Sequence, residues 1–367
     1  MVRVTRRHSI PSGGIANSGA PSQPAQQQQQ QQQKHQQALA QSSPAARTTA
    51  AKAAAAGSAV VGAEPNVQSV VLGDMLIRAW YPSFYPEELV DARTERLYTC
   101  PWCFRYSKEL MPYLGHMNTC PVKQNGPPGE PIYQRGECSV YEVDGEQHKL
   151  FTQNISLFAK LFLDTKSVFY DVTTFLYYIL TMTDPNTGEL STVGFFSKEK
   201  LSWDNNNLAC IIVFPPWQRK GYGQILMGVS YELSKRERRL GGPEKPLSEL
   251  GRKGYLAFWS STIARCLLGR PAKKNVTVRK LSEETYIQPD DIVAALKEMG
   301  IVDRRKRGSA EALINKAKVR AWVEANRVSL QPLVYSESFL REEVTDEEME
   351  DVDEGSAEGE EEEEDDE

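Results

Sequence analysis

The stretch LACIIVFPPWQRKGYGQILM, Leu208–Met227, determines the fold of the central part of the chain. It places a run of apolar residues, typical of a buried strand, before a short polar loop with two glycines and then a helix. Glycines in such a loop let backbone N–H groups approach a pyrophosphate at the helix N-terminus, where the helix dipole favours anions, and Arg219 and Lys220 add positive charge. The pattern indicates a phosphate-binding loop, although R-x-G-x-G by itself more often belongs to an ordinary loop.

Segments on both sides of this stretch predict a mixed α/β core. Three upstream segments read as strands: 139–143, 149–158 and 191–197. The turn-rich Asp184–Gly188 is typical of a hairpin connection. Downstream, apolar residues at helical spacing predict one helix over Gly223–Arg238 and another over 252–268. A third helix is expected to begin at Pro289 and to end at Gly300, as part of a small helix-turn-helix subdomain.

Four metal-ligand side chains follow the spacing C-x2-C-x12-H-x3-C: Cys100, Cys103, His116 and Cys120. This spacing places two thiolates on a knuckle and a second pair one helical turn apart, which suits tetrahedral zinc. Four protein ligands leave no open coordination position, so a structural zinc is expected rather than a catalytic one. A DNA-reading finger is the rival interpretation, but a lone finger rarely supplies specific affinity.

The net charge of -6 conceals an uneven distribution. Residues 342–367 contain eighteen Asp and Glu and no Lys or Arg, so the rest of the chain is basic. A basic body with an acidic tail indicates a polyanionic partner such as chromatin, with the tail competing for the same basic surface. A tail that only aids solubility is the alternative.

Composition also separates the two ends of the chain from its middle. Residues 1–68 hold the glutamine run Gln26–Gln33 and an alanine-rich stretch, and too few apolar residues to offset the entropy of ordering. We therefore expect disorder over 1–68 and over the acidic segment 336–367, with folded structure from Val70 onward.

Cysteine usage and hydropathy predict the compartment. Six cysteines, three of them clustered with a histidine, indicate a metal site in a reducing environment rather than a disulfide framework. No run of eighteen apolar residues occurs, and the first ten residues lack the apolar stretch of a secretory signal. We expect a soluble protein that is neither exported nor membrane-associated.

Several motifs resemble known sequences when they are taken together. QRKGYG, Gln218–Gly223, resembles the acetyl-CoA loop of the GNAT-type acetyltransferase fold. Further motifs resemble the MYST family of histone lysine acetyltransferases: LYTCPWC (97–103), LFLDTKSVFYDV (161–172), GFFSKEK (194–200), SYELSK (230–235) and GGPEKPLSELG (241–251). The resemblance extends from about Val70 to Leu268 and continues more weakly to about Tyr335.

The resemblance implies a fold and a division of the chain. The fold is an α/β, GNAT-like acetyltransferase core with an N-terminal CCHC zinc finger and a C-terminal helix-turn-helix subdomain. The expected division is a Gln/Ala-rich tail over 1–68, strands and the zinc finger over 69–127, an acetyl-CoA-binding core over 128–270, the helix-turn-helix-like subdomain over 271–335 and an acidic tail over 336–367.

The resemblance also assigns catalytic roles. A lysine amine, with a pKa of about 10.4, is mostly protonated at neutral pH, so acetyl transfer to it needs a base. Glu244 falls on the family's catalytic glutamate, whereas composition alone would make it an exposed loop residue. Cys210 falls beside the thioester, and direct attack by the amine is preferred over an acetyl-Cys210 intermediate because proximity and proton removal can suffice. Lys166 matches a lysine that becomes autoacetylated, or is an ordinary exposed lysine.

Further acetyl-CoA contacts are implied for backbone groups of Ile211, Ile212 and Val213 and for Arg219, Lys220, Gly221, Tyr222, Gly223, Gln224 and Ser248. Ala257 stands where some relatives carry a serine that touches the cofactor, so that contact is expected to be missing. GGPE and FPPWQ replace the commoner GSPE and LPPYQ, and no chromo-like domain precedes the finger. These departures resemble the SAS-type branch, which implies the histone H4 tail as substrate.

Partners are inferred from the same resemblance. Nucleosomal histones are the expected substrate, scaffold subunits of a chromatin-modifying complex the expected partners, and the nucleus the expected location. The basic cluster Arg304–Arg307 indicates a nuclear import signal, a weak DNA contact or an ordinary basic loop. Two other functions remain open: a zinc-finger and helix-turn-helix DNA-binding regulator, and a non-catalytic chromatin subunit.

Overall fold

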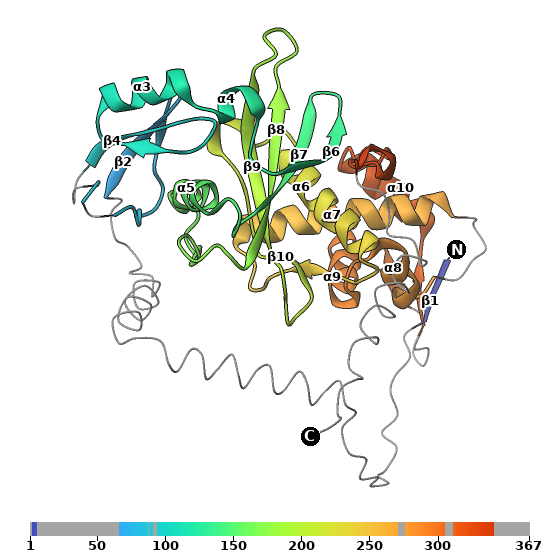
Figure 1. Ribbon diagram of the computed structural model, residues 1–367. Coiled ribbons are helices and arrows are strands. Elements are labelled where there is room, and N and C mark those ends of the chain that lie inside the picture. The colour runs from blue at the N-terminus through green and yellow to red at the C-terminus, as the bar shows by residue number, and fades with distance from the viewer. Residues whose placement is uncertain are drawn as a thin grey trace, which may run out of the picture.

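A five-stranded antiparallel sheet forms the centre of the molecule (Figure 1). The computed structural model describes residues 2–5, 66–86, 88–90, 94–270, 276–304 and 311–340. The strands, in spatial order, are β11 (Cys210–Val213), β9 (Leu190–Glu199), β8 (Phe175–Thr183), β7 (Cys138–Asp144) and β6 (Glu130–Arg135). The strands predicted at 139–143 and 191–197 and the hairpin at Asp184–Gly188 are thus confirmed. Asp184 stabilises this turn by accepting hydrogen bonds from the N–H groups of Asn186 and Thr187.

The strand predicted over 149–158 is wrong, because this segment forms the helix α5 (Lys149–Lys160). Phe151, Ile155 and Phe158 are buried at spacings of four and three residues, which is the periodicity of a helix. Leu150 lies on the other side and is 72% exposed. Every residue from 154 to 160 is buried as well, so the second half of the helix is enclosed on all sides and does not show the alternation of a strand.

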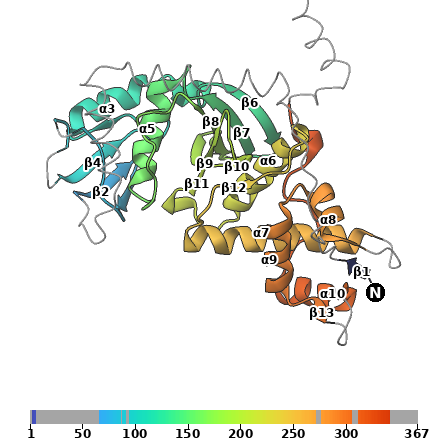
Figure 2. The same cartoon turned by 90° about the horizontal axis from the view of Figure 1, so that it is seen from below.

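Two helices cover the two faces of the sheet (Figure 2). On one face, Tyr177, Phe195 and Ile212 pack in the same core as residues of α5. On the other face, Tyr178 and Phe196 pack with residues of α6 (Tyr222–Arg236). The helix predicted over Gly223–Arg238 is confirmed by α6. Successive side chains of β8 and β9 point to opposite faces of the sheet, and apolar residues occur on both faces, which explains why both are buried.

A second core lies beside the sheet and is built from helices: α7 (Glu249–Gly269), α8 (Val278–Thr285), α9 (Pro289–Met299) and α10 (Lys316–Ala325). The helices predicted at 252–268 and at Pro289–Gly300 are confirmed, and Gly300 ends α9 in the left-handed region with a φ of 62°. Apolar side chains of α7, α8, α9 and α10 share this core, so it continues across the expected boundary at residue 270.

The N-terminal region forms a four-stranded sheet and two helices. Its elements are β2 (Val67–Leu72), β3 (Met75–Arg78), β4 (Thr94–Thr99), β5 (Tyr106–Ser107), α3 (Leu110–Thr119) and α4 (Val122–Asn125). Phe104 joins this region to the central core, with its ring centroid 5.3 Å from that of Phe158 and 5.5 Å from that of Phe214. The finger region therefore packs on the core.

Short elements complete the fold. β1 (Val2–Thr5), β14 (Glu311–Ile314) and β13 (Val302–Arg304) form a three-stranded sheet. The 3-10 helix η2 (Ser336–Ser338) leads into Phe339, whose ring packs edge-to-face against that of Tyr133 with centroids 5.1 Å apart. Segments expected to be disordered thus include three paired or packed pieces, 2–5, 66–68 and 336–340, while 6–65 and 341–367 lie outside the described residues. No helix within the described part of the chain has the length and apolar character needed to cross a membrane.

Candidate active site and metal site

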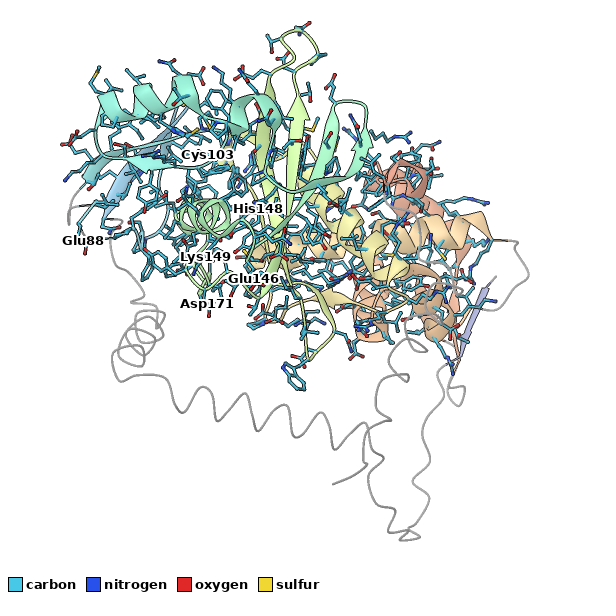
Figure 3. All side chains as sticks on the ribbon, viewed as in Figure 1. Glu88, Cys103, Glu146, His148, Lys149 and Asp171 are labelled. Atoms are coloured by element: carbon cyan, nitrogen blue, oxygen red, sulfur yellow. The ribbon has the colours of Figure 1, made fainter. Side chains whose placement is uncertain are left out.

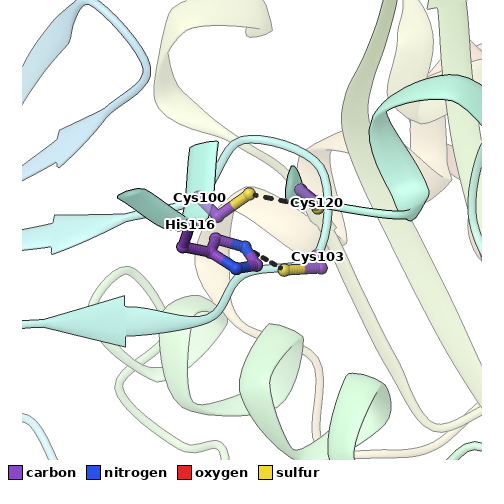
Figure 4. A group of neighbouring side chains, drawn as sticks. All are labelled: Cys100, Cys103, His116 and Cys120. Atoms are coloured by element: carbon purple, nitrogen blue, oxygen red, sulfur yellow. Dashed lines mark hydrogen bonds between the residues drawn. The ribbon is translucent and has the colours of Figure 1, made fainter. Parts of the chain in front are cut away.

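The structure brings the four predicted zinc ligands together (Figure 4). Their ligand atoms all lie within 4.8 Å of one another. The sulfur atoms of Cys100 and Cys120 are 3.7 Å apart, and the Cys103 sulfur lies 3.1 Å from Nε2 of His116. Zinc–sulfur bonds of about 2.3 Å in a tetrahedron predict a sulfur–sulfur edge of about 3.8 Å. The donor set and its spacing therefore fit zinc.

The surroundings of this cluster indicate a structural role. Cys100 and Cys120 are buried and pack with Trp102. Cys100 and Cys103 belong to the turn after β4, whereas His116 lies in the last turn of α3 and Cys120 follows that helix. A hydrogen bond from the Cys103 thiol lowers the pKa of Cys100, and the same interaction raises the pKa of Cys103. Zinc held here would fasten α3 to the β4–β5 turn.

The predicted phosphate loop follows β11 through the 3-10 helix η1 (Pro215–Trp217). Gly221 adopts a φ of 89° as the residue before α6, a left-handed conformation that favours glycine. Arg219 also has a positive φ of 63°. The Gln218 side chain donates to the Val213 carbonyl at 2.9 Å and so fastens the loop to the strand.

The start of α6 suits an anion. The N–H groups of Tyr222 and Gly223 lie in the first turn, where a helix offers no intrahelical acceptor. Arg219 and Lys220 are exposed beside them. The Gln224 side chain donates to the carbonyl of Gly254 at 3.0 Å, so it fixes the start of α6 against α7. The arrangement fits the pyrophosphate of acetyl-CoA.

The sheet is open next to this loop. β11 pairs with β9, and none of the described strands pairs with its other edge. The neighbouring strands β10 (Asn206–Leu208) and β12 (Gly242–Pro243) instead pair with each other in parallel. Ile211, Ile212 and Val213 therefore lie on an edge strand, whose free backbone groups can bind an extended ligand.

Cys210 lies at the start of this edge strand and is half-buried. It pairs with Ser197, which pairs in turn with Tyr177, so the three lie in one row across the sheet. The Tyr177 hydroxyl is 2.9 Å from Ser156 of α5. Burial raises the pKa of Tyr177, and the proximity of Cys210 adds to the rise.

Lys166 approaches the same face of the sheet. Its Nζ lies 5.9 Å from the centroid of the buried Phe195 ring, and Phe195 pairs with Ile212 of β11. The side chain is half-buried, so it differs from an ordinary exposed lysine.

Glu244 directly follows β12. Its N–H donates to the carbonyl of Leu208 at 2.8 Å, two residues before Cys210. The Glu244 side chain is exposed at the surface, yet partial burial raises its pKa, and the negative charges of Glu199 and Asp204 add to the rise. The structure therefore brings Glu244 and the start of β11 to one edge of the sheet.

The segment around Glu244 is held by the helical core. Lys245 Nζ lies 2.6 Å from Oδ1 of Asp291, a residue of α9 that is only 4% exposed. The N–H of Gly241 donates to the carbonyl of Tyr286 at 3.3 Å. The C-terminal helices thus contact the segment that carries Glu244.

Sequence reasoning missed the neighbours Glu199, Asp204 and Asp291. Asp291 lies in the first turn of α9, 46 residues from Lys245, and no local signal in the sequence pairs the two. Ser248, predicted on the cofactor, caps α7 by accepting the Gly251 N–H at 3.1 Å. Ala257 is exposed on α7.

The basic cluster is only partly described. Arg304 ends β13, and its companions at 305–307 lie outside the described residues.

These features define a mixed α/β domain with a built-in CCHC finger, an anion-binding loop and a carboxylate at one sheet edge. The sequence pattern of the MOZ/SAS family matches residues 126–339, and that of the MYST family zinc finger domain matches residues 64–120. The chain therefore belongs to the MOZ/SAS family, and the predicted family and fold are confirmed.

Three relatives illustrate the similarity. Histone acetyltransferase MOF of Drosophila melanogaster is 43% identical over 236 residues, which is 64% of this chain and 28% of the relative. Histone acetyltransferase KAT6B of Mus musculus is 43% identical over 244 residues, 66% of this chain and 13% of the relative. Histone acetyltransferase of the MYST family 2 of Arabidopsis thaliana is 40% identical over 241 residues, 66% of this chain and 52% of the relative. The chain spans about half the length of these relatives or less.

Proposed function

We propose that this chain is an acetyl-CoA-dependent protein-lysine acetyltransferase that modifies nucleosomal histones. One observation carries the proposal: the Glu244 backbone is hydrogen-bonded to Leu208, beside the strand that starts at Cys210 and leads into the Arg219–Gly221 loop. One bound molecule of acetyl-CoA can therefore place its pyrophosphate at the start of α6 and its thioester near Cys210, beside the segment that carries the proposed base. The names of the relatives, all histone acetyltransferases, support the same activity.

Glu244 is proposed as the general base. Acetyl-CoA, when bound, supplies an activated acyl group. The acceptor ammonium must lose a proton before its nitrogen can attack, and the Glu244 carboxylate takes that proton. A raised pKa makes this carboxylate a stronger base than that of an ordinary glutamate. Such general-base catalysis contributes about 10²–10⁴-fold in rate.

Binding of the cofactor is proposed to use two groups of residues. Arg219, Lys220 and the first-turn N–H groups of α6 neutralise the pyrophosphate. The edge backbone of Ile211–Val213 pairs with the pantetheine arm, as a peptide strand would at a sheet edge. Ser248 keeps a hydroxyl hydrogen free to donate, because its oxygen accepts the Gly251 N–H.

Cys210 and Lys166 are proposed to lie beside the acyl group. Direct attack by the substrate amine needs no covalent relay once both substrates are held together, so Cys210 shapes the thioester position without carrying the acetyl group. Lys166 lies over Phe195 on the face that Cys210 shares, a placement that supports its acetylation by the enzyme itself.

The histone H4 tail is proposed as the substrate, in the nucleus and within a complex whose scaffold subunits bring the enzyme to nucleosomes. Support for this assignment comes from the departures in GGPE and FPPWQ and from the basic balance of the chain upstream of its acidic tail. Weak DNA contact through the cluster at 304–307 would add a phosphate-dependent contribution to nucleosome binding.

The test combines the purified chain, labelled acetyl-CoA and nucleosomes, followed by mapping of the labelled lysines. We expect label on the H4 tail. Cofactor binding by calorimetry without any transfer would favour the non-catalytic chromatin subunit. Absence of cofactor binding, together with binding to DNA alone, would favour the DNA-binding regulator.

A further inference from the structure

The connection between β9 and β10, residues 200–205, exposes two large apolar side chains. Leu201 is 90% exposed and Trp203 is 84% exposed, the two highest values among the large hydrophobic residues of the described part of the chain. Figure 1 shows this connection projecting beyond the end of the sheet. Two apolar side chains of this size, exposed within three residues of one turn, make this connection a candidate interaction site.

The connection is a fixed turn rather than a loose loop. Lys200 at its start pairs with Asp144 at 2.9 Å and with Glu146 at 3.4 Å. Figure 3 shows Glu146 at the end of the sheet from which the connection projects. The N–H of Asn206 donates to the Ser202 hydroxyl at 3.1 Å, and Asn205 adopts a left-handed φ of 54°. Trp203 is therefore presented to solvent at little additional entropic cost on binding.

The turn is next to the proposed base. Its C-terminal end continues into β10, where Asn206 pairs with Gly242, two residues before Glu244. Glu199 precedes the turn and Asp204 lies within it, and both charges act on Glu244. These three carboxylates would repel the phosphates of acetyl-CoA and attract a lysine- and arginine-rich peptide.

We infer that Leu201 and Trp203 form a docking lip for an apolar side chain of the basic substrate peptide, close to the acceptor lysine. This inference rests on the proposed acetyltransferase function. The acidic residues select a cationic peptide, and the lip selects among cationic peptides those with a large apolar residue near the lysine. Trp203 acts as the anchor, since a rigid aromatic side chain gives a large contact area for little lost freedom.

The experiment measures peptide affinity separately from acetyl transfer. Two short synthetic peptides share a lysine- and arginine-rich sequence, with either a leucine or a serine beside the central lysine. Calorimetry on the full chain compares Trp203→Ala, the double variant Leu201→Ala/Trp203→Ala and the control Met111→Ala. Met111 is 74% exposed but lies on α3 in the finger region.

We expect the double variant to bind the leucine peptide about tenfold more weakly and the serine peptide as wild type does. In transfer assays the same variant should raise KM for the leucine peptide, with kcat and KM for acetyl-CoA unchanged. Met111→Ala should match wild type throughout. Equal affinity of wild type and the double variant for the leucine peptide would contradict the proposal that Leu201 and Trp203 dock the peptide.

Two further outcomes would also contradict this docking proposal. One is an equal loss of affinity of the double variant for both peptides, and the other is a change in its self-association alone, measured by sedimentation. Absence of transfer in wild type, with peptide affinity still dependent on Trp203, would instead overturn the proposed function.

Discussion

The ion pair between Lys245 and Asp291 links the segment that carries Glu244 to α9. Its two partners differ in environment, because Asp291 is 4% exposed whereas the side chain of Lys245 is 51% exposed. Asp291→Asn removes the buried charge and leaves a lysine that can turn into solvent. Lys245→Met removes the exposed partner and leaves a carboxylate buried without a counter-charge. The two substitutions break the same contact with unequal consequences.

The structure sets the magnitudes. Breaking a fully buried pair costs about 3–5 kcal/mol, mainly because a charge is left uncompensated. We expect Lys245→Met to lower the free energy of unfolding by about 3 kcal/mol, since Asp291 has no other charged partner among its described contacts and its Oδ2 makes no hydrogen bond there. Asp291→Asn should cost only about 1 kcal/mol, because solvent screens Lys245. The double variant should recover most of the loss seen with Lys245→Met.

Chemical denaturation measures these stabilities, and steady-state transfer measures the consequence for the site. Each single variant should lower kcat about tenfold, with KM for acetyl-CoA unchanged, because the segment before Pro246 loses its tether. Glu283→Gln is the control, since the Arg279–Glu283 pair is exposed and lies within α8. A larger stability loss for Asp291→Asn than for Lys245→Met would refute the reasoning. Unchanged kcat in both variants would show that the pair does not position Glu244.

Three other perturbations test separate parts of the site. Cys210→Ala should retain substantial transfer by direct attack; a covalent acetyl trapped on Cys210 in a competent time course would contradict this. Glu199→Gln removes one of the charges that raise the pKa of Glu244, so the acid limb of the kcat/KM profile should move to lower pH. The shift should be partial, because burial is the larger cause of the raised pKa. An unchanged acid limb would show that Glu199 does not act on Glu244. Cys120→Ser should lower bound zinc by elemental analysis and lower Tm, and an unchanged Tm with zinc lost would contradict a structural role.

Local sequence patterns were sufficient to predict those features whose residues lie within a few positions of one another along the chain. The Leu208–Met227 stretch predicts its strand, loop and helix, because Gly221 and the apolar spacing of α6 act within a few residues. The four zinc ligands were predictable for the same reason, since each pair is close in sequence. The segment 149–158 was misread because a short apolar run fits both periodicities until burial is known.

Features that depend on distant residues were not predictable. Lys245 and Asp291 are 46 residues apart, and their contact follows from how α9 packs against α7. The raised pKa of Glu244 depends first on its burial in the folded chain and then on Glu199 and Asp204, which strand pairing brings close. The exposure of Trp203 is similarly a property of the folded turn, since a tryptophan in sequence is ordinarily expected to be largely buried.

The central claim is that Glu244 accepts a proton from the substrate lysine at the open edge of the sheet. Its most direct test is the rate of acetyl transfer to an H4 tail peptide by wild type and Glu244→Gln, measured across pH at saturating acetyl-CoA. We predict a loss of about 10²-fold or more near neutral pH, unchanged affinity for acetyl-CoA, and loss of the acid limb that the raised pKa of Glu244 gives to wild type. Equal rates for the two proteins across the pH range would contradict it.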